Sequence, residues 1–424
     1  MSATALQPGM RVVVIGAGIV GAATALVLQR KGLAVTLVDR GPPGMECSYG
    51  NGGAISPDFC VPASLPGMLK RVPRWFADPL GPLVVRWQRL PAALPWLVRW
   101  IRAGDLERVR EVAVALRALH APSLARYADL LGPRAEGLIE KTGQIYVWQS
   151  ERSSPTEALA RELREAQGVV AQPLSAGEIR DLDPNLAPGF VRGLYFPDNG
   201  HTVNPLRLVQ TLVELFVQAG GRLERRQVAG FTLVQDRAAA VRCADASQVP
   251  ADAFVVATGI RGRDLAGPLG DRVALEAERG YHAMLPDPGV RPRIKISNRD
   301  HMFGLTPMEH GVRISGTVEF AGPDAPMDER RARALLVHAK RMYPGLNDAG
   351  AQFWMGSRPS TPDSLPVIGR ARRAANVVYA FGHGHTGLTG APVTADLVHA
   401  LVTAAPPPLD PAPFRASRFH EWSS

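Results

Sequence analysis

Three glycines close to the N-terminus have the spacing of a loop that holds a dinucleotide. Gly16, Gly18 and Gly21 follow a run of β-branched residues. The first permits a tight turn, the second lets the backbone approach a pyrophosphate, and the third lets a helix touch a strand. The helix that begins here offers free N–H groups and a partial positive charge to the pyrophosphate. Asp39, eighteen residues after Gly21, is placed to accept the ribose hydroxyls of an adenosine. We therefore predict a dinucleotide site.

A polar, glycine-rich loop at residues 44–53 indicates which dinucleotide is bound. An NAD-binding chain normally continues with regular strand–helix units. This loop instead has small side chains and exposed N–H groups. Such a loop suits the edge of an isoalloxazine ring and its ribityl chain, so FAD is the expected cofactor.

The elements around these loops are of two kinds. Apolar runs typical of buried parallel strands stand at residues 11–15, 34–38, 253–257 and 376–380. The alternating pattern of antiparallel strands stands at residues 280–285, 295–297, 301–305, 313–317 and 352–356. Helices are predicted at residues 22–31, 106–119, 204–219 and 391–403.

These patterns predict an α/β fold of mixed α+β character. A Rossmann-like FAD-binding domain is expected to interleave with an antiparallel-sheet substrate domain. The predicted bounds are 1–60, 201–265 and 356–424 for the first, and 61–200 and 266–355 for the second, with a helical excursion at 69–140.

The composition fits a globular protein in a reducing compartment. Of the 424 residues, 46% are hydrophobic and 21% are charged, which excludes a disordered or fibrous chain. Cys47, Cys60 and Cys243 form no Cys-x-x-Cys pair. This pattern argues against a disulfide-stapled secreted fold, a cysteine-rich zinc site and thiol-pair chemistry. We expect no metal site and a cytoplasmic location.

Two segments bear on membranes. The uncharged stretch 12–29 is interpreted as the nucleotide loop and its helix rather than as a membrane span, because it contains three glycines and follows no basic leader. Residues 69–102 combine seven cations and one acid, Asp78, with four tryptophans, Trp75, Trp87, Trp96 and Trp100.

Two interpretations of 69–102 stay open. Tryptophan with arginine is typical of a segment lying among lipid headgroups, which predicts peripheral contact at the inner membrane face. Alternatively, the segment is an irregular excursion that packs its tryptophans inward, because five prolines prevent one long amphipathic helix. The net charge of +9 comes without the alternation of basic and exposed aromatic residues that a nucleic-acid groove shows, so no nucleic-acid partner is expected.

The chain resembles the D-amino-acid oxidase family of flavoproteins, and within it the D-amino-acid dehydrogenase-like branch. The matching residues span nearly the whole chain. They are 12–40, 47–53, 255–259, the block Trp354-Met355-Gly356-Ser357-Arg358-Pro359, Thr361-Pro362-Asp363, 365–369 and 380–387. The Gly-x-Arg-Pro block with the following Thr-Pro-Asp is the most specific of these motifs to the family.

The resemblance implies non-covalent FAD held at several places; Tyr49 stands where a covalently linking His would. The residues implied are the first loop with its helix and acid (Gly16, Gly18, Ile19, Val20, Gly21, Asp39, Arg40), the flavin loop (Ser48, Asn51, Gly52, Gly53), the adenine and pyrophosphate neighbours (Val228, Thr258, Gly259), and the last loop (Gly382, His383, Gly384, Thr386, Gly387, Leu388).

The resemblance also implies the substrate site. Arg358 is expected to clamp an amino acid's carboxylate, since a planar fork of two donors suits that group better than Lys does. Tyr281, His282 and His301 are candidates for the opposite wall, with plain packing as the alternative.

The implied reaction is oxidation of the Cα–N bond of a D-amino acid to the imine, by hydride transfer to flavin N5. Water then gives a 2-oxo acid and ammonia, and the electrons pass to a quinone or carrier. A D-hydroxyproline dehydrogenase and a glycine- or sarcosine-type oxidase are the alternatives, because a secondary amine uses the same geometry.

Overall fold

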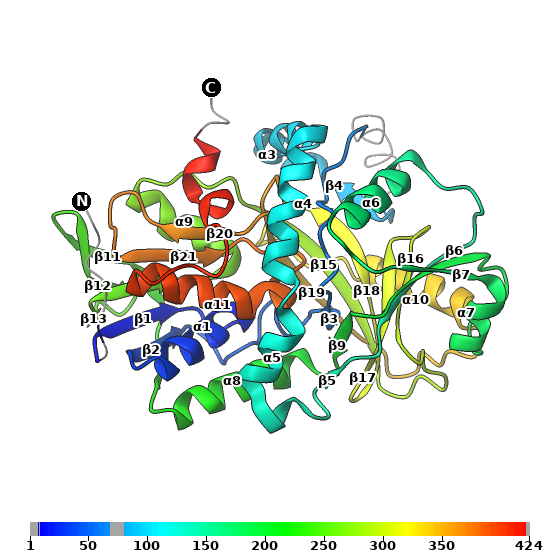
Figure 1. Ribbon diagram of the computed structural model, residues 1–424, viewed down its shortest axis with the longest axis horizontal. Helices are drawn as coiled ribbons and strands as arrows, with labels where there is room; N and C mark the ends of the chain where they lie inside the picture. Colours follow the sequence, from blue (N-terminus) through cyan, green and yellow to red (C-terminus); the bar gives the residue numbers. More distant parts are fainter. Residues whose placement is uncertain (1–6, 8, 68–79, 421–424) are drawn as a thin grey trace.

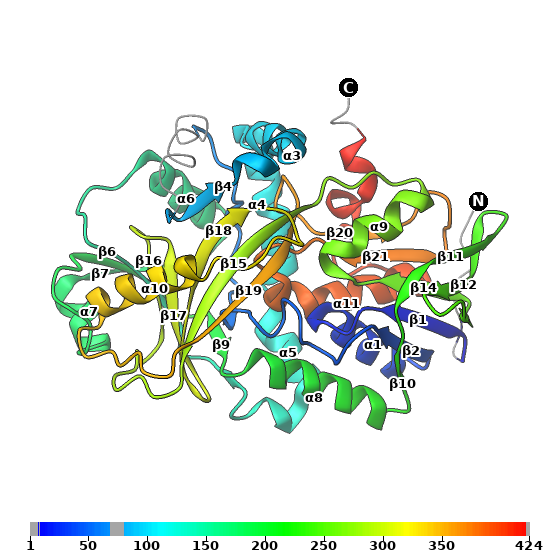
Figure 2. The ribbon, with the colours of Figure 1, turned by 180° about the vertical axis from the view of Figure 1, so that it is seen from behind.

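The molecule has two halves side by side, each built on its own β-sheet (Figures 1 and 2). This is a computed structural model, and it describes residue 7 and residues 9–67 and 80–420. The half on the left of Figure 1 holds both chain ends and a six-stranded sheet. Its strands, in spatial order, are β10 (Arg222–Arg225), β2 (Ala34–Asp39), β1 (Arg11–Ile15), β14 (Ala253–Val256), β21 (Val377–Phe381) and β20 (Val367–Arg370).

This first sheet is parallel except at β20, which runs antiparallel to β21. One face is covered by α1 (Ile19–Arg30), α8 (Pro205–Gln218) and α11 (Gly387–Thr403), with α1 and α11 in contact. The other face is covered by a meander of β11 (Val228–Val234), β12 (Arg237–Cys243) and β13 (Gln248–Pro250), and by α9 (Gly262–Ala266). With apolar layers on both faces, the central strands β14 and β21 are buried throughout and β1 is buried after Arg11, as their β-branched runs predict.

The second half is built on a nine-stranded mixed sheet. Its strands, in order, are β19 (Gln352–Ser360), β15 (Glu276–Leu285), β18 (Gly311–Phe320), β17 (Phe303–Met308), β16 (Lys295–Asn298), β6 (Gln144–Trp148), β8 (Arg192–Phe196) and β7 (Gln172–Ser175), with β4 (Leu83–Val85) beside β18. Helix α10 (Glu329–Met342) packs on one face and closes an apolar core. The opposite face borders a cavity between the two halves.

Helices and a small sheet join the halves. The helices are α3 (Leu90–Arg102), α4 (Leu106–His120), α5 (Ser123–Leu131), α6 (Pro155–Ala166) and α7 (Ala176–Leu182), and the sheet is β3 (Ala54–Ile55), β9 (Gly200–Thr202) and β5 (Ile139–Glu140). Helices α4 and α5 pack against α11, and α3 lies at the edge of the molecule above α4 (Figure 1).

The predicted mixed α/β fold with a Rossmann-like sheet is confirmed. The predicted helix at 106–119 is α4. One expectation needs correction: β19 continues to Ser360, so Arg358 lies within a strand rather than after one. Its ladder with β15 extends from Gln352 to Ser360, which keeps the backbone extended through Pro359. The numerical domain bounds stay a prediction.

Candidate active site

A cavity of about 1800 Å³ lies between the two sheets and receives residues from both. The nucleotide half contributes the loops that follow β1, β2, β14 and β21. The other half contributes the exposed face of the large sheet. The carboxyl ends of parallel strands are where such sheets bind ligands.

Each of the three N-terminal glycines has its own structural role. Gly16 has φ +102°, and a Cβ there would lie 2.5 Å from the Ala257 carbonyl oxygen. At Gly21 a Cβ would lie 1.7 Å from the Gly16 carbonyl oxygen, so only glycine lets α1 approach β1 this closely. At Gly18 the one atom near such a Cβ is the Ser48 Oγ at 3.4 Å, so this backbone borders the cavity.

Asp39 is held at the end of β2 by two backbone donors. Its Oδ2 accepts a hydrogen bond from Ala17 N at 2.6 Å and its Oδ1 accepts one from Gly41 N at 2.9 Å. Arg40 pairs with Glu46. Asp39 and Arg40 line the cavity together with Val228, Thr258 and Gly259, so the structure gathers all five predicted nucleotide neighbours.

The loop at 48–53 is fastened to both halves. Ser48 Oγ accepts from Ile19 N at 3.0 Å, at the start of α1, and Asn51 Oδ1 accepts from Gly53 N at 2.8 Å. Arg313 Nη1, from β18, donates to the carbonyls of Tyr49 and Asn51 at 2.8 and 2.7 Å. Arg313 was missed by sequence reasoning, because nothing in the sequence places β18 beneath this loop.

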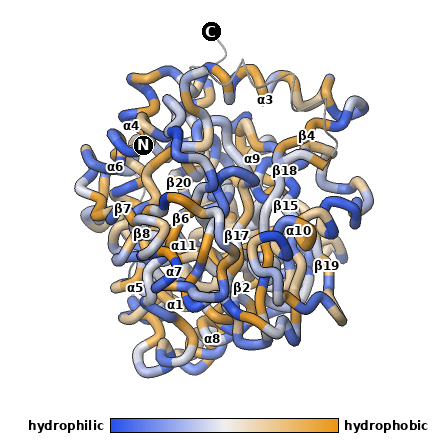
Figure 3. Tube along the Cα trace, turned by 90° about the vertical axis from the view of Figure 1, so that its right-hand side faces the viewer, coloured by the Kyte–Doolittle hydropathy of each residue, from blue (hydrophilic) through white to orange (hydrophobic). Residues whose placement is uncertain are grey.

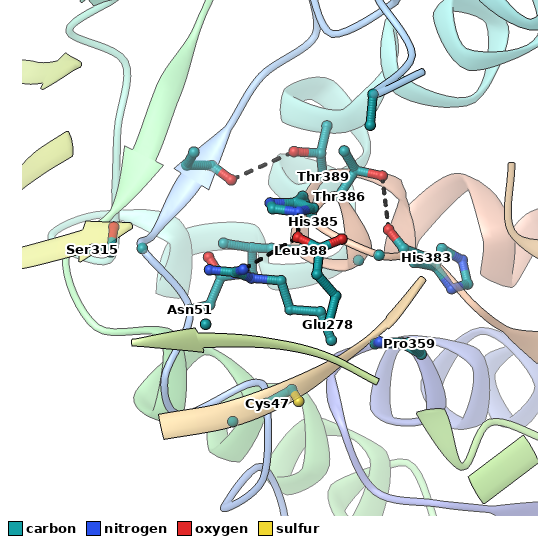
Figure 4. Close-up of a pocket in the computed structure, with 18 of the residues that line it drawn as sticks. Cys47, Asn51, Glu278, Ser315, Pro359, His383, His385, Thr386, Leu388 and Thr389 are labelled. Atoms are coloured by element: carbon teal, nitrogen blue, oxygen red, sulfur yellow. Dashed lines mark hydrogen bonds and ion pairs between the residues drawn. The ribbon is translucent and has the colours of Figure 1, made fainter. Parts of the chain in front are cut away.

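The last glycine loop leads into α11. Gly382 and Gly384 have φ values of +84° and +51°, which other residues rarely adopt. His383 Nε2 lies 2.9 Å from Thr394 Oγ1, and burial lowers the pKa of His383 to about 3. The imidazole is therefore neutral and structural near pH 7. The Thr386 hydroxyl donates to the His383 carbonyl at 3.2 Å (Figure 4).

These residues fit FAD. Neither α1 nor α11 has a capping side chain at its own N-cap residue or an acid in its first turn, and in α1 the Ser48 hydroxyl takes up only the Ile19 N–H. The residues at both helix starts line the cavity. Unfilled N–H groups at two helix N-termini suit a ligand with negative charge at two places. Ile19, Val20, Gly387 and Leu388 border the same space. Of the predicted FAD-binding residues, Gly21 and Gly53 lie behind the lining and act through packing.

Cys47 also borders the cavity, and its thiol is unreactive. Its Sγ donates to the Ser357 carbonyl at 2.9 Å, and burial, with Glu46 nearby, raises the pKa of Cys47 to about 12. A thiol that stays protonated is a poor nucleophile.

Arg358 lies flat over a glycine at the sheet side of the cavity. A Cβ on Gly280 would lie 2.0 Å from the Arg358 Nη2 atom, so the missing side chain makes room for the guanidinium. Its Nη1 lies 3.2 Å from the Thr317 carbonyl oxygen and 3.4 Å from Glu278 Oε1. The Nε and Nη2 atoms have no hydrogen-bond partner among the described residues, and Arg358 lines the cavity.

Glu278 is an acid that sequence reasoning missed. Its carboxylate accepts from Ser360 Oγ at 2.8 Å and contacts His385 (Figure 4). Burial opposes its ionisation, but His385 and Arg358 outweigh this and lower the pKa of Glu278 to about 2. The signal available in the sequence was alternation: Glu278 and Gly280 share a strand face.

The other candidates for the substrate wall have structural partners. Tyr281 borders the cavity, but its hydroxyl donates to Glu319 at 2.6 Å in the apolar core. His282 lies beneath the flavin loop, with its Nδ1 3.1 Å from the Gly50 carbonyl oxygen and its ring stacked on Trp354. His301 is exposed and stacks on His338 at 4.3 Å. Neither His282 nor His301 lines the cavity.

Three further cations, Lys295, Arg299 and Arg164, line the cavity and were also missed. They come from β16, the residue that follows it, and α6. Lysine is rare in this chain, with five among 424 residues. A lysine within a predicted strand, as at Lys295, was the sequence signal that could have identified this group of cations. No group of three or more metal-ligating side chains is found in the described part of the chain.

The family model described as FAD dependent oxidoreductase matches residues 11–401. A D-amino-acid oxidase of Bradyrhizobium diazoefficiens is 39% identical, covering 98% of this chain and 100% of the relative. A D-amino acid dehydrogenase of Vibrio cholerae is 30% identical, covering 94% of this chain and 96% of the relative. Among solved structures, L-proline dehydrogenase from P. horikoshii matches with a TM-score of 0.74 at 19% identity, over 98% of this chain and 99% of the other.

Proposed function

Because the chain belongs to the FAD-dependent oxidoreductase family, we propose that this enzyme is a D-amino-acid dehydrogenase, which oxidises the Cα–N bond of its substrate to an imine. Water then converts the imine to a 2-oxo acid and ammonia. The two full-length relatives act, by name, on D-amino acids. The observation that carries the proposal is Arg358, a guanidinium in the same cavity as the first turns of α1 and α11.

The chain's own residues bind and orient. Arg358 holds the α-carboxylate with its free Nε and Nη2 donors, a charge-assisted pair that fixes the α-carbon in one position. Glu278 keeps the guanidinium in place through Nη1. Backbone N–H groups at the start of α11 stabilise negative charge that develops next to them. FAD held by the glycine loops and the first turns of α1 and α11 would supply the hydride acceptor for this oxidation.

The test is an anaerobic absorbance scan of the purified holoenzyme. The panel holds D- and L-amino acids, D-hydroxyproline, glycine and sarcosine. We expect D-amino acids to bleach the flavin band and their L-enantiomers to leave it unchanged. Bleaching by D-hydroxyproline or sarcosine alone would replace the substrate with a secondary amine, and a flavin that nothing on the panel bleaches would overturn the proposal.

The electron acceptor is proposed to be a quinone or carrier reached at a membrane surface. Helix α3 separates the cavity from the outside: Trp96 and Trp100 on its inner face line the cavity, whereas Leu94 and Val98 on its outer face are 51% and 39% exposed. Figure 3 shows hydrophobic segments along α3 at the top edge of the molecule. Arg102, exposed at the end of α3, adds charge that suits anionic headgroups.

Both interpretations of residues 69–102 thus keep support, since α3 packs two tryptophans inward and exposes apolar residues outward; Trp75 and Asp78 lie outside the described residues. None of the described helices is long and apolar enough to cross a bilayer. Sedimentation with phosphatidylglycerol vesicles tests surface contact. We expect the pair of changes Leu94→Glu and Val98→Glu to reduce binding at least fivefold, and Val337→Glu, at another exposed valine, to leave it unchanged. Equal binding by all three proteins would contradict the contact.

A further inference from the structure

Beyond Arg358, the cavity continues along the large sheet to a second group of cations. A row of residues in register crosses four strands, from Ser315 on β18 through Gly304 and Ser297 to Tyr146 on β6. All four line the cavity. Lys295 and Arg299 stand two residues either side of Ser297, so their side chains share its face, and both also line the cavity.

The cation heads converge on this row. The Lys295 Nζ atom would lie 3.7 Å from a Cβ on Gly304, so the ammonium leans over that glycine. The Arg299 guanidinium lies 4.9 Å from the centre of the Tyr146 ring, and Arg164 lies 5.8 Å from the same centre. We call Lys295, Arg299 and Arg164 the distal cations.

The distal cations lack carboxylate partners. Within the described residues no Asp or Glu oxygen lies within 4.0 Å of any of the three charged heads. Other cavity arginines are paired: Arg192 with Glu157 at 2.9 Å and Arg358 with Glu278 at 3.4 Å. Half-buried cations without counter-charges are costly unless a ligand supplies the charge.

Acids near the distal cations are too few to neutralise them. Asp58 is buried, and its Oδ1 has no hydrogen-bond partner among the described residues. Glu157, a charged neighbour of Arg299, is already paired with Arg192. Asp300, beside Arg299, also lines the cavity, but it is exposed and accepts a hydrogen bond from Gln149 N at 2.7 Å. Three cations against two unpaired carboxyl groups still leave this end of the cavity net positive, so the ligand that fits it is an anion.

The spacing from Arg358 fits a small dicarboxylate. Arg358 Nη1 contacts the Thr317 carbonyl on β18, and Lys295 leans over Gly304 on the neighbouring strand β17. Gly304 pairs with Ser315, two residues from Thr317. One strand spacing and two residues along the strand separate the two heads by roughly 8 Å. Each head reaches about 3 Å toward a carboxylate, so the two heads are close enough to bind the two carboxylates of one short-chain ligand.

We propose that the distal cations bind the side-chain carboxylate of an acidic D-amino acid, aspartate or glutamate, while Arg358 binds its α-carboxylate. This inference rests on the proposed function and names the substrate class of the same site.

The test compares acids with their isosteric amides. Anaerobic flavin reduction is measured with D-aspartate against D-asparagine and with D-glutamate against D-glutamine. We expect kcat/KM for each acid to exceed that for its amide at least tenfold. Lys295→Met is expected to lower this ratio about tenfold, and Lys295→Arg to restore part of it. Lys340→Met is the matched control, because Lys340 pairs with Asp348 on the outer surface at 2.8 Å.

A binding measurement keeps the test independent of turnover. Titration of the flavin spectrum with succinate and with butyrate gives two dissociation constants, and the distal cations predict at least tenfold tighter binding of succinate in the parent enzyme but not in Lys295→Met. Amides reduced as fast as acids, with succinate and butyrate bound equally, would overturn the inference and leave a D-amino-acid dehydrogenase. No reduction by any D-amino acid would instead overturn the proposed function.

Discussion

The two ends of the cavity present different chemical groups to a ligand. At the nucleotide end, ligand-facing groups are backbone atoms and glycines: Gly18, the 382–388 loop and the first turns of α1 and α11. At the sheet end they are charged side chains, Arg358, Glu278 and the distal cations. Backbone loops are set by short stretches of sequence and tolerate little change. Side chains from separate strands can be exchanged without rebuilding a loop, so we infer that the sheet end decides which substrate is used.

The largest expected effect is at the nucleotide end. In Gly21→Ala the new Cβ would lie 1.7 Å from the Gly16 carbonyl oxygen, which forces α1 away from β1. We expect the purified variant to lose most of its flavin absorbance and to be destabilised by about 1–3 kcal/mol. Gly41→Ala is the control, because nothing lies within 4 Å of its added methyl group. Full flavin content in Gly21→Ala would show that this contact is not needed.

Next in size is the loss of the α-carboxylate clamp. Arg358→Met should lower kcat/KM for every amino acid by roughly 10²- to 10³-fold, about 3–4 kcal/mol, while flavin content stays at the level of the parent enzyme. Arg358→Lys should recover only a small part, because an ammonium lacks the planar fork. Steady-state kinetics with a soluble electron acceptor measure both variants. A small change confined to acidic substrates would assign the clamp to another residue.

A smaller and uniform effect is expected at Glu278. Glu278→Gln weakens the contacts to Arg358 and His385 and so loosens the guanidinium. We expect kcat/KM to fall roughly tenfold, about 1.4 kcal/mol, for acids and amides alike. An unchanged acid-to-amide ratio of kcat/KM distinguishes this positioning role from a role in substrate selection. A faster variant would mean that Glu278 competes with the substrate for Arg358.

The smallest effect is a pH dependence confined to the sheet end. Burial lowers the pKa of Lys295 to about 8, with Asp58 and Arg299 as its charged neighbours. The ammonium is charged below that pKa and neutral above it, so binding of an acidic side chain is present at pH 7 and weakens toward pH 9. His201, also near Lys295, has its pKa lowered by burial to about 4 and does not titrate in this range.

The measurement is the acid-to-amide ratio of kcat/KM between pH 7 and 9, in which the titration of the shared amino group cancels. We expect a fall of about threefold to tenfold, from the loss of one cation. The ratio should be flat across this range in Lys295→Met. A ratio that rises with pH would contradict a cationic Lys295 as the selecting group.

The sequence predicts the residues of the nucleotide end better than those of the sheet end. The glycine loops were predictable because their function depends on neighbours within a few residues: Gly16, Gly18 and Gly21 show the turn, the helix and the close approach in one short motif. Arg358 was identified through its Gly-x-Arg-Pro block. Glu278 and Lys295 were not, because each acquires its role from strand pairing between residues far apart in the sequence, Glu278 with Arg358 and Lys295 with Gln144. His282 was a candidate for the substrate wall, with packing as the alternative, and it lies beneath the flavin loop.

The attachments of the loop at 48–53 restrict how the enzyme opens. Arg313 holds two of its carbonyls, the Thr306 hydroxyl donates to the Gly52 carbonyl at 2.7 Å, and Gly50 lies directly on Trp354. These hydrogen bonds and this packing contact hold the nucleotide half against the sheet half. A hinge motion that parted the halves would break several of these bonds at once. These bonds therefore oppose any opening of the cavity that depends on separation of the two halves.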